Sequence, residues 1–253
     1  MLNHPTLDKL NTLKLSGMSK ALAEQAQNSE IDSLSFEERL GLLVDREITE
    51  RENRRFRYRL SHAKLKHQAT IEDIDYTHQR GLDRTLTQQL ITGQWIRQGY
   101  NLIITGPTGI GKSWLASALA YQGCRYHYNV LYLRVPRLLS DLALAKGDGR
   151  YINLLSNLAK RHLIVLDDWG LNPIHADQAR DLLEIFDDRY HKHATLITSQ
   201  LPIEKWHELI SEPTLADAIL DRIVHQAYKL NLKGESLRKT KTKLPLTDET
   251  ELA

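Results

Sequence analysis

A glycine-rich segment of the chain has the residue types needed to bind a nucleoside triphosphate. Residues 106–113 read Gly-Pro-Thr-Gly-Ile-Gly-Lys-Ser and match G-x-x-x-x-G-K-[ST] at every fixed position. In this pattern the backbone N–H groups surround phosphates, the lysine neutralises the outer phosphates and the hydroxyl holds Mg²⁺. The predicted ATP-binding residues are Gly106, Pro107, Thr108, Gly109, Ile110, Gly111, Lys112, Ser113 and Trp114, with Ser113 as a Mg²⁺ ligand and Lys112 as a catalytic residue.

The flanking residues provide the context that separates this motif from a chance glycine-rich turn. An apolar, strand-like run, residues 102–105, precedes the loop, and residues 114–121 follow without Gly or Pro, as a helix requires. We therefore interpret the segment as a phosphate-binding loop between a strand and a helix.

Two adjacent acids end a second apolar run. Asp167 and Asp168 follow residues 163–166, and the carboxyl end of a parallel strand opens toward the ligand crevice. We predict that Asp167 reaches the Mg²⁺ through its water shell and that Asp168 polarises the attacking water, which makes the protein an ATPase. Because glutamate is more common in the second role, the shorter Asp168 favours slow turnover.

A third strand end and two arginines complete the candidate site. Thr198, Ser199 and Gln200 follow a strand-like run, and any of them can orient the water, although a polar turn before a proline explains them equally well. We take Thr198 as the catalytic candidate. If subunits form a ring or spiral, Arg222 enters the neighbour's site; the alternative is a surface ion pair with a nearby aspartate. Arg238 can touch the phosphates within its own subunit, although the generally basic segment around it explains this arginine equally well.

The elements that must position these residues alternate along the chain. Strands are expected at residues 102–105, 130–133, 163–166, 194–198 and 228–232, with the clearest helices at 112–121 and 179–190. This order predicts an α/β fold with a five-stranded, mostly parallel sheet covered by crossover helices.

The N-terminal region reads as helical and ends in a basic segment. Two short helices within residues 7–27 precede a capping box at 35–38 and a long helix with an apolar stripe at Phe36, Leu40, Leu43, Val44 and Ile48. We predict a small all-α domain at 1–70, an ATPase domain at 71–243 and a disordered acidic tail at 244–253. The candidate DNA-binding residues are Arg51, Arg54, Arg55, Arg57, Arg59 and Lys64.

The composition of the chain bears on disulfide bonds, cellular compartment and bound metals. The 253 residues carry a formal charge of +2, and Cys124 is the only cysteine, so no intramolecular disulfide is possible. The N-terminus has no basic and apolar leader pattern, and no run is long enough to span a bilayer, so we expect a cytoplasmic protein with no membrane association. His4, His191 and His193 lack the spacing of a closed metal site, so Mg²⁺ is the one metal expected.

The motifs together resemble the AAA+ ATPases of the initiator group, and most closely the IstB helper proteins of bacterial insertion sequences, relatives of the helicase loader DnaC. The likeness covers nearly the whole chain and is carried by residues 35–38, 51–59, 63–64, 95–96, 106–113, 166–170, 198–202 and 234–238. It implies a three-layer AAA+ fold and an ATP-dependent DNA-binding oligomer that prepares duplex DNA and stimulates a partner transposase. In such relatives the acidic pair is also Asp-Asp.

Several alternatives remain open at the level of sequence. A helicase loader shares most of these motifs and would engage single-stranded DNA. A second alternative is a small-molecule P-loop kinase, although the arginine-rich mobile lid expected of such a kinase is not evident. A third is an adaptor that binds nucleotide without hydrolysing it. No base-reading helix is legible, so we expect duplex binding with little sequence preference and an ATP-dependent homo-oligomer.

Overall fold

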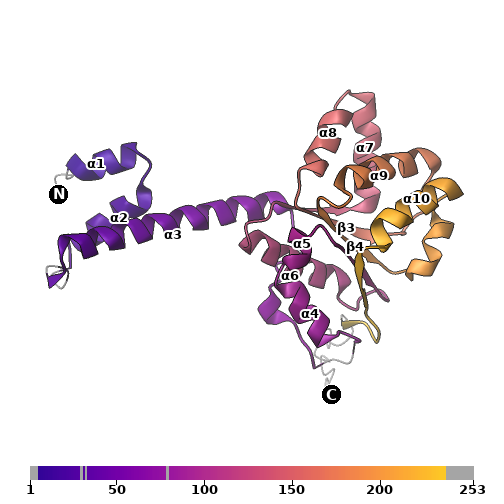
Figure 1. Cartoon of the computed structure of the whole chain (residues 1–253), viewed down its shortest axis with the longest axis horizontal. Helices are drawn as coiled ribbons and strands as arrows, with labels where there is room; N and C mark the ends of the chain where they lie inside the picture. Colours follow the sequence, from indigo (N-terminus) through magenta and orange to yellow (C-terminus); the bar gives the residue numbers. More distant parts are fainter. Residues whose placement is uncertain (1–4, 29–30, 32, 78–79, 238–253) are drawn as a thin grey trace, which may run out of the picture. The chain divides into compact units, whose positions relative to one another are not determined.

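The computed structural model describes residues 5–28, 31, 33–77 and 80–237 (Figure 1). Two compact units divide the chain, residues 1–59 and residues 60–253. The sequence placed this boundary after residue 70, whereas the compact units divide inside one long helix. The reason is that the segment following the helix belongs to the larger unit, where Ala63 and Ala69 are both buried.

The smaller unit consists of helices α1 (Pro5–Thr12), α2 (Ser16–Gln25) and most of α3 (Phe36–Ala63). The predicted capping box is present at the start of α3, because Glu38 N donates to Ser35 Oγ at 3.3 Å and Ser35 N donates to Glu38 Oε2 at 2.8 Å. The break between the first two helices lies at residues 13–15, just before the predicted Ser16-Gly17 position.

A buried carboxylate joins α2 to α3. Glu47 of α3 accepts hydrogen bonds from the backbone N–H groups of Gly17 (2.7 Å) and Met18 (3.2 Å), which are free donors at the first turn of α2. Arg51 donates to the same carboxylate at 2.7 Å, and Arg54 donates to Ser16 Oγ at 2.7 Å. Arg54 therefore joins α3 to α2 directly, and Arg51 holds the Glu47 carboxylate that bonds α2.

The apolar stripe of α3 does not pack as its periodicity predicted. Leu43 is buried, whereas Phe36, Leu40, Val44 and Ile48 are exposed. The α2 contact uses the Leu43 and Glu47 side of the helix, so four stripe residues remain at the surface of the described chain.

The larger unit is a three-layer α/β fold. Its elements are η2 (Ile71–Asp73), α4 (Arg84–Ile91), α5 (Gln94–Arg97), β1 (Asn101–Thr105), α6 (Lys112–Arg125), β2 (Val130–Arg134), α7 (Val135–Gly147), α8 (Tyr151–Ala159), β3 (Leu163–Trp169), α9 (Ala176–Arg189), β4 (Ala194–Ser199), η3 (Ile203–Lys205), η4 (His207–Leu209), α10 (Pro213–Val224) and β5 (Ala227–Asn231). All five predicted strands are confirmed. The largest difference is at β3, which continues from Leu166 to Trp169.

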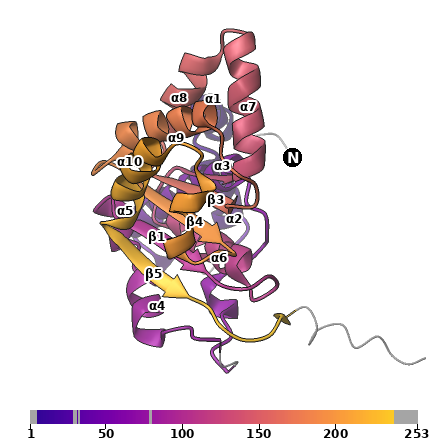
Figure 2. The ribbon, with the colours of Figure 1, turned by 90° about the vertical axis from the view of Figure 1, so that its right-hand side faces the viewer.

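The five strands form one parallel sheet in the order β2-β3-β4-β1-β5. Figure 2 shows β5 at the edge of this sheet. One face, including Ile103 and Ile164, joins the apolar core formed with α7, α8, α9 and α10. On the other face, Gly123 of α6 lies beside Val130 and Leu163, and Figure 1 shows α4, α5 and α6 on that side. None of the described helices has the length and hydropathy of a transmembrane segment.

Candidate nucleotide-binding site

The predicted phosphate-binding loop connects β1 to α6 at the carboxyl edge of the sheet. Gly106, Gly109 and Gly111 have φ angles of 146°, 79° and 99°, a region that residues with a side chain rarely adopt. A Cβ at Gly106 would lie 2.4 Å from the carbonyl oxygen of Leu232, and one at Gly109 would lie 2.1 Å from Ser236 Oγ. The glycines therefore serve both the loop conformation and the close approach of residues 232–237.

That C-terminal segment is bonded to the loop along its backbone. Leu232 N donates to Thr105 O at 2.8 Å, and Leu237 N donates to Gly109 O at 3.0 Å. The segment thus fixes the loop at its start and at its middle. Arg238 lies outside the described residues, so its predicted phosphate contact stays a prediction.

Lys112 begins α6 and turns back over the loop. Its Nζ donates to Gly106 O at 2.6 Å and to Pro107 O at 2.8 Å. Burial lowers the pKa of this lysine, and the charges of Asp167 and Asp168 oppose that shift. The loop carbonyls therefore hold the ammonium group of Lys112 over the glycine loop.

Ser113 and Asp167 meet as the sequence predicted for a metal pair. Ser113 Oγ donates to Asp167 Oδ1 at 2.7 Å, and the Asp167 side chain is fully buried. A hydroxyl and a carboxylate are the oxygen ligands that Mg²⁺ takes in proteins when phosphate oxygens complete its shell. Together with the glycine cradle, this donor set fits a nucleotide with Mg²⁺.

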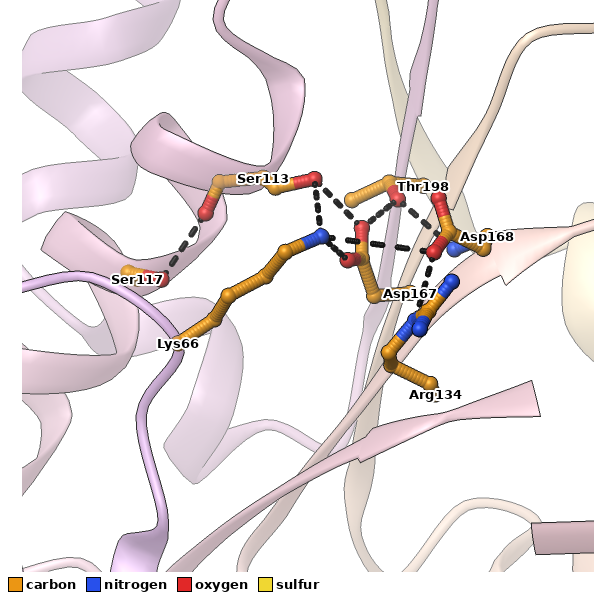
Figure 3. A network of polar contacts seen from close by, with 7 residues as sticks. All are labelled: Lys66, Ser113, Ser117, Arg134, Asp167, Asp168 and Thr198. Atoms are coloured by element: carbon orange, nitrogen blue, oxygen red, sulfur yellow. Dashed lines mark hydrogen bonds and ion pairs between the residues drawn. The ribbon is translucent and has the colours of Figure 1, made fainter. Parts of the chain in front are cut away.

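Asp167 is surrounded by donors. Thr198 Oγ1 donates to Asp167 Oδ1 at 2.5 Å, and Lys66 Nζ donates to Oδ2 at 2.7 Å (Figure 3). Burial by itself would raise the pKa of Asp167, but the hydrogen bonds from Lys66, Thr198 and Ser113 outweigh it and hold the pKa below its usual range. The carboxylate is therefore kept ionised.

A buried tyrosine lies beside the same carboxylate. Burial is the main cause, and the Asp167 charge the second, of the raised pKa of Tyr132 on β2, so its phenol stays protonated. Its hydroxyl is buried and makes no hydrogen bond of good geometry to the described residues. This O–H group nevertheless lies close enough to Asp167 to help lower the pKa of that carboxyl.

Asp168 occupies an unusual backbone conformation. Its φ angle is +64°, and it lies where the register between β3 and β4 shifts. Its Oδ2 accepts from Arg134 Nε at 2.8 Å, and its N–H donates to Thr198 Oγ1 at 3.3 Å (Figure 3). Strained backbone of this kind persists where surrounding contacts enforce it, often at functional sites.

The structure distinguishes the three polar residues after β4. Thr198 contacts both acids, as described above. Ser199 Oγ instead donates to Trp169 O at 2.8 Å and accepts from Leu201 N, and Gln200 is exposed. Thr198 is therefore the one of the three with contacts to the acidic pair.

Arg222 lies at the amino ends of the parallel strands, whereas the phosphate loop lies at their carboxyl ends. Its carbonyl oxygen accepts from Asn101 Nδ2 at 3.0 Å, which places it at the amino end of β1. From Asn101 to Thr105, β1 covers four steps of about 3.3 Å, so about 13 Å of strand lies between that end and the loop. The guanidinium donates to Asp187 and, at 2.8 Å, to Ala218 O. It does not reach its own loop.

Three residues near the acids escaped the sequence analysis: Lys66, Tyr132 and Arg134. The basic run contains Lys66, but nothing local marks it as lying 2.7 Å from an acid 101 positions later. Arg134 pairs in register with Asp167 across β2 and β3. Its role depended on the strand order, which the sequence does not reveal.

The candidate DNA-binding arginines differ in their surroundings. Arg55, Arg57 and Lys64 are exposed, and Arg59 is half-buried. Arg51 and Arg54 are also exposed but make the contacts to Glu47 and Ser16 given above.

The glycine loop, the Ser113–Asp167 pair and the parallel sheet define a P-loop nucleotide-binding protein with a fold of the AAA+ type. The fold of this chain resembles that of DnaI (TM-score 0.56, 22% identity, 65% of this chain and 91% of that chain) and of the DnaC helicase loader (TM-score 0.50, 19% identity, 59% and 87%). The chain belongs to the IstB-like ATP-binding protein family, which matches residues 8–244.

Curated relatives agree with this assignment. An insertion sequence ATP-binding protein of Sinorhizobium fredii is 56% identical over 94% of this chain and 98% of its own length. The ATP-binding protein of insertion sequence IS21 from Pseudomonas aeruginosa is 32% identical over 96% and 94%. The predicted resemblance is thereby confirmed at the level of the family.

Proposed function

We propose that this protein is an ATP- and Mg²⁺-dependent regulator of DNA transposition that assembles on duplex DNA, hydrolyses ATP and stimulates a partner transposase. The observation that carries the proposal is the bonded set of Ser113, Asp167, Thr198 and Asp168 beside a glycine loop of the kind that binds nucleotide phosphates. Membership of an insertion-sequence family supports the biological role.

Each side chain of the site has one task in this mechanism. Mg²⁺, when bound, supplies positive charge to the phosphate oxygens. Lys112 binds the outer phosphates, and Ser113 with Asp167 holds the metal. Thr198 fixes Asp167 through its hydroxyl. Asp168 accepts a proton from the attacking water once its carboxylate is released from Arg134.

A neighbouring subunit completes the site. Because Arg222 lies about 13 Å of strand away from its own loop, its transition-state role requires the loop of another copy. In the single chain Asp187 holds the guanidinium, so assembly exchanges this ion pair for a phosphate contact. Bound ATP thereby acts as the switch for oligomer formation.

Duplex DNA is the proposed partner of the basic segment. Arg55, Arg57 and Lys64 are exposed cations, and arginine and lysine contacts to phosphates bind DNA with little sequence preference. Arg51 and Arg54 are expected to contribute less, because they already stabilise the smaller unit.

Light scattering with a random duplex of about 50 base pairs, with and without ATP and over a salt series, tests the proposal. We expect a large complex that needs both ATP and duplex, weakens steeply with salt and is absent for Lys112→Ala. For Asp168→Asn we expect ATP binding with almost no phosphate release. Assembly on single strand alone would instead support helicase loading.

A further inference from the structure

The ammonium group of Lys66 lies among the oxygen atoms of the metal pair. Its Nζ is 2.7 Å from Asp167 Oδ2, 3.5 Å from Ser113 Oγ and 4.0 Å from Asp168 Oδ2. Figure 3 shows the side chain reaching in from a loop that belongs to neither β3 nor α6 and ending between the hydroxyl and the two carboxylates. A single positive charge therefore faces the three groups on which Mg²⁺ chemistry depends.

The loop that carries Lys66 is anchored on the larger unit. Lys64 ends α3 with a left-handed backbone conformation, φ +53°, and Ala63 before it is fully buried. Ala69, a few residues after Lys66, is 1% exposed. The lysine side chain itself is 33% exposed, whereas its partner Asp167 is 0% exposed. The Asp167 carboxylate is thus enclosed by protein, whereas the Lys66 ammonium group can move toward solvent.

We propose that Lys66 is an internal cation of the nucleotide site that competes with Mg²⁺ for Asp167 and Ser113. This inference rests on the proposed binding of ATP with Mg²⁺. Two cations that share one carboxylate at contact distance repel each other strongly in a partly buried site. Binding of Mg²⁺ with ATP therefore expels the Lys66 ammonium group toward solvent. Without nucleotide, the same group neutralises a buried acid for which it is the ion-pair partner within the described part of the chain.

Because of this competition, bound nucleotide and Mg²⁺ decide whether residues 64–70 are held against the site or released from it. Because coupling is reciprocal, a metal that displaces Lys66 releases the loop, and a loop that holds Lys66 in place weakens metal binding. A purely structural ion pair has a different signature. Its loss would destabilise the protein without changing how ATP affinity depends on Mg²⁺.

Nucleotide binding by the Lys66→Met variant tests the proposal, because methionine keeps an unbranched side chain without the charge. A fluorescent ATP analogue is titrated into the full chain at a series of Mg²⁺ concentrations and in EDTA. We expect tighter binding with Mg²⁺, by about 5- to 150-fold, the usual range of coupling between two sites. In EDTA we expect weaker binding, since Lys66 then acts as the cation for the phosphates. Lys160→Met, at an exposed lysine that follows α8 in the same unit and lies in no assigned site, is the control and should match the wild type.

A second measurement uses the unaltered chain, so it does not depend on folding of the variant. Acetylation of lysines followed by mass spectrometry should be slow at Lys66 without nucleotide and faster with ATP and Mg²⁺, whereas the exposed Lys160 should react alike in both. The same Mg²⁺ dependence in Lys66→Met and wild type, or weaker binding in the variant with Mg²⁺, would overturn the competition. A wild-type chain that binds no ATP would instead refute the proposed function itself.

Discussion

Replacing Thr198 by valine removes one hydroxyl from a fully enclosed position and keeps the shape of the side chain. The hydroxyl donates to Asp167 Oδ1 at 2.5 Å and accepts from Asp168 N at 3.3 Å. In the variant, one lone pair of a buried carboxylate and one backbone N–H lose their partners. Thr198 itself is 1% exposed, so water does not readily replace the hydroxyl.

The size of the effect follows from these two contacts. A hydrogen bond to a charged group contributes about 1.5–3 kcal/mol, and the long bond from Asp168 adds little, so we expect a loss of about 2–3 kcal/mol. For a unit of the size of residues 60–253, each kcal/mol lowers Tm by about 2–4 °C, which gives a decrease of about 4–12 °C.

Tryptophan fluorescence during thermal and urea denaturation measures this loss in the unit concerned, because Trp95, Trp114, Trp169 and Trp206 all belong to it. The matched control is Thr195→Val on the same strand. Its hydroxyl is also buried, but its contact with Arg189 is long, 3.4 Å, so we expect a loss below about 1 kcal/mol.

The pH dependence supplies a second check. Hydrogen bonds lower the folded-state pKa of Asp167, so their stabilisation is present above the unfolded pKa and is lost as pH falls through the folded pKa. The deficit of Thr198→Val should therefore be largest near neutral pH and shrink in acid. A Thr198→Val protein as stable as Thr195→Val at neutral pH would refute the reasoning.

Three further outcomes are expected. Mixing Arg222→Ala with Asp168→Asn protein should restore part of the ATP hydrolysis that each lacks, measured by phosphate release; no recovery would contradict a contribution in trans. Burial depresses the pKa of His162 and of His193, so the free energy of unfolding should fall as pH drops below about 6.5. Urea titrations should show a smaller fall for the double variant His162→Asn/His193→Asn, and an equal fall would show that these two histidines are not its cause. Glu47→Ala should speed amide exchange across residues 16–25 by about tenfold or more, and unchanged exchange would show that the carboxylate does not hold α2.

Local patterns were sufficient to predict the sheet and the core of the site. β1, β3 and β4 are buried along nearly all of their length and are continuous apolar runs, so they could be predicted without knowledge of the strand order. In β5 only Leu230 is buried, and its prediction rested on the alternation of strands and helices. The phosphate loop is a contiguous motif, and Asp167 needed only the rule that ligands gather at the carboxyl ends of parallel strands. The pairing of Ser113 with Asp167 follows from those two facts.

Contacts between distant segments were not predictable from the same patterns. Arg134 reaches Asp168 because β2 lies beside β3, and several strand orders are compatible with one alternation of elements. Lys66 belongs to a charge run, and such a run does not indicate which member is enclosed. On α3 the periodicity located an apolar stripe but not the side that packs, which a buried carboxylate at Glu47 decides.

The placement of Arg222 and the phosphate loop at opposite edges of the sheet has a numerical consequence for any assembly built on the proposed contact. Donor and acceptor surfaces then differ, so each contact joins the head of one copy to the tail of the next. A row of copies with free ends has one fewer completed site than it has subunits, whereas a closed ring completes all of them. Turnover per subunit should therefore rise with the length of an open row and approach a plateau, a dependence that distinguishes the two geometries without an image of either.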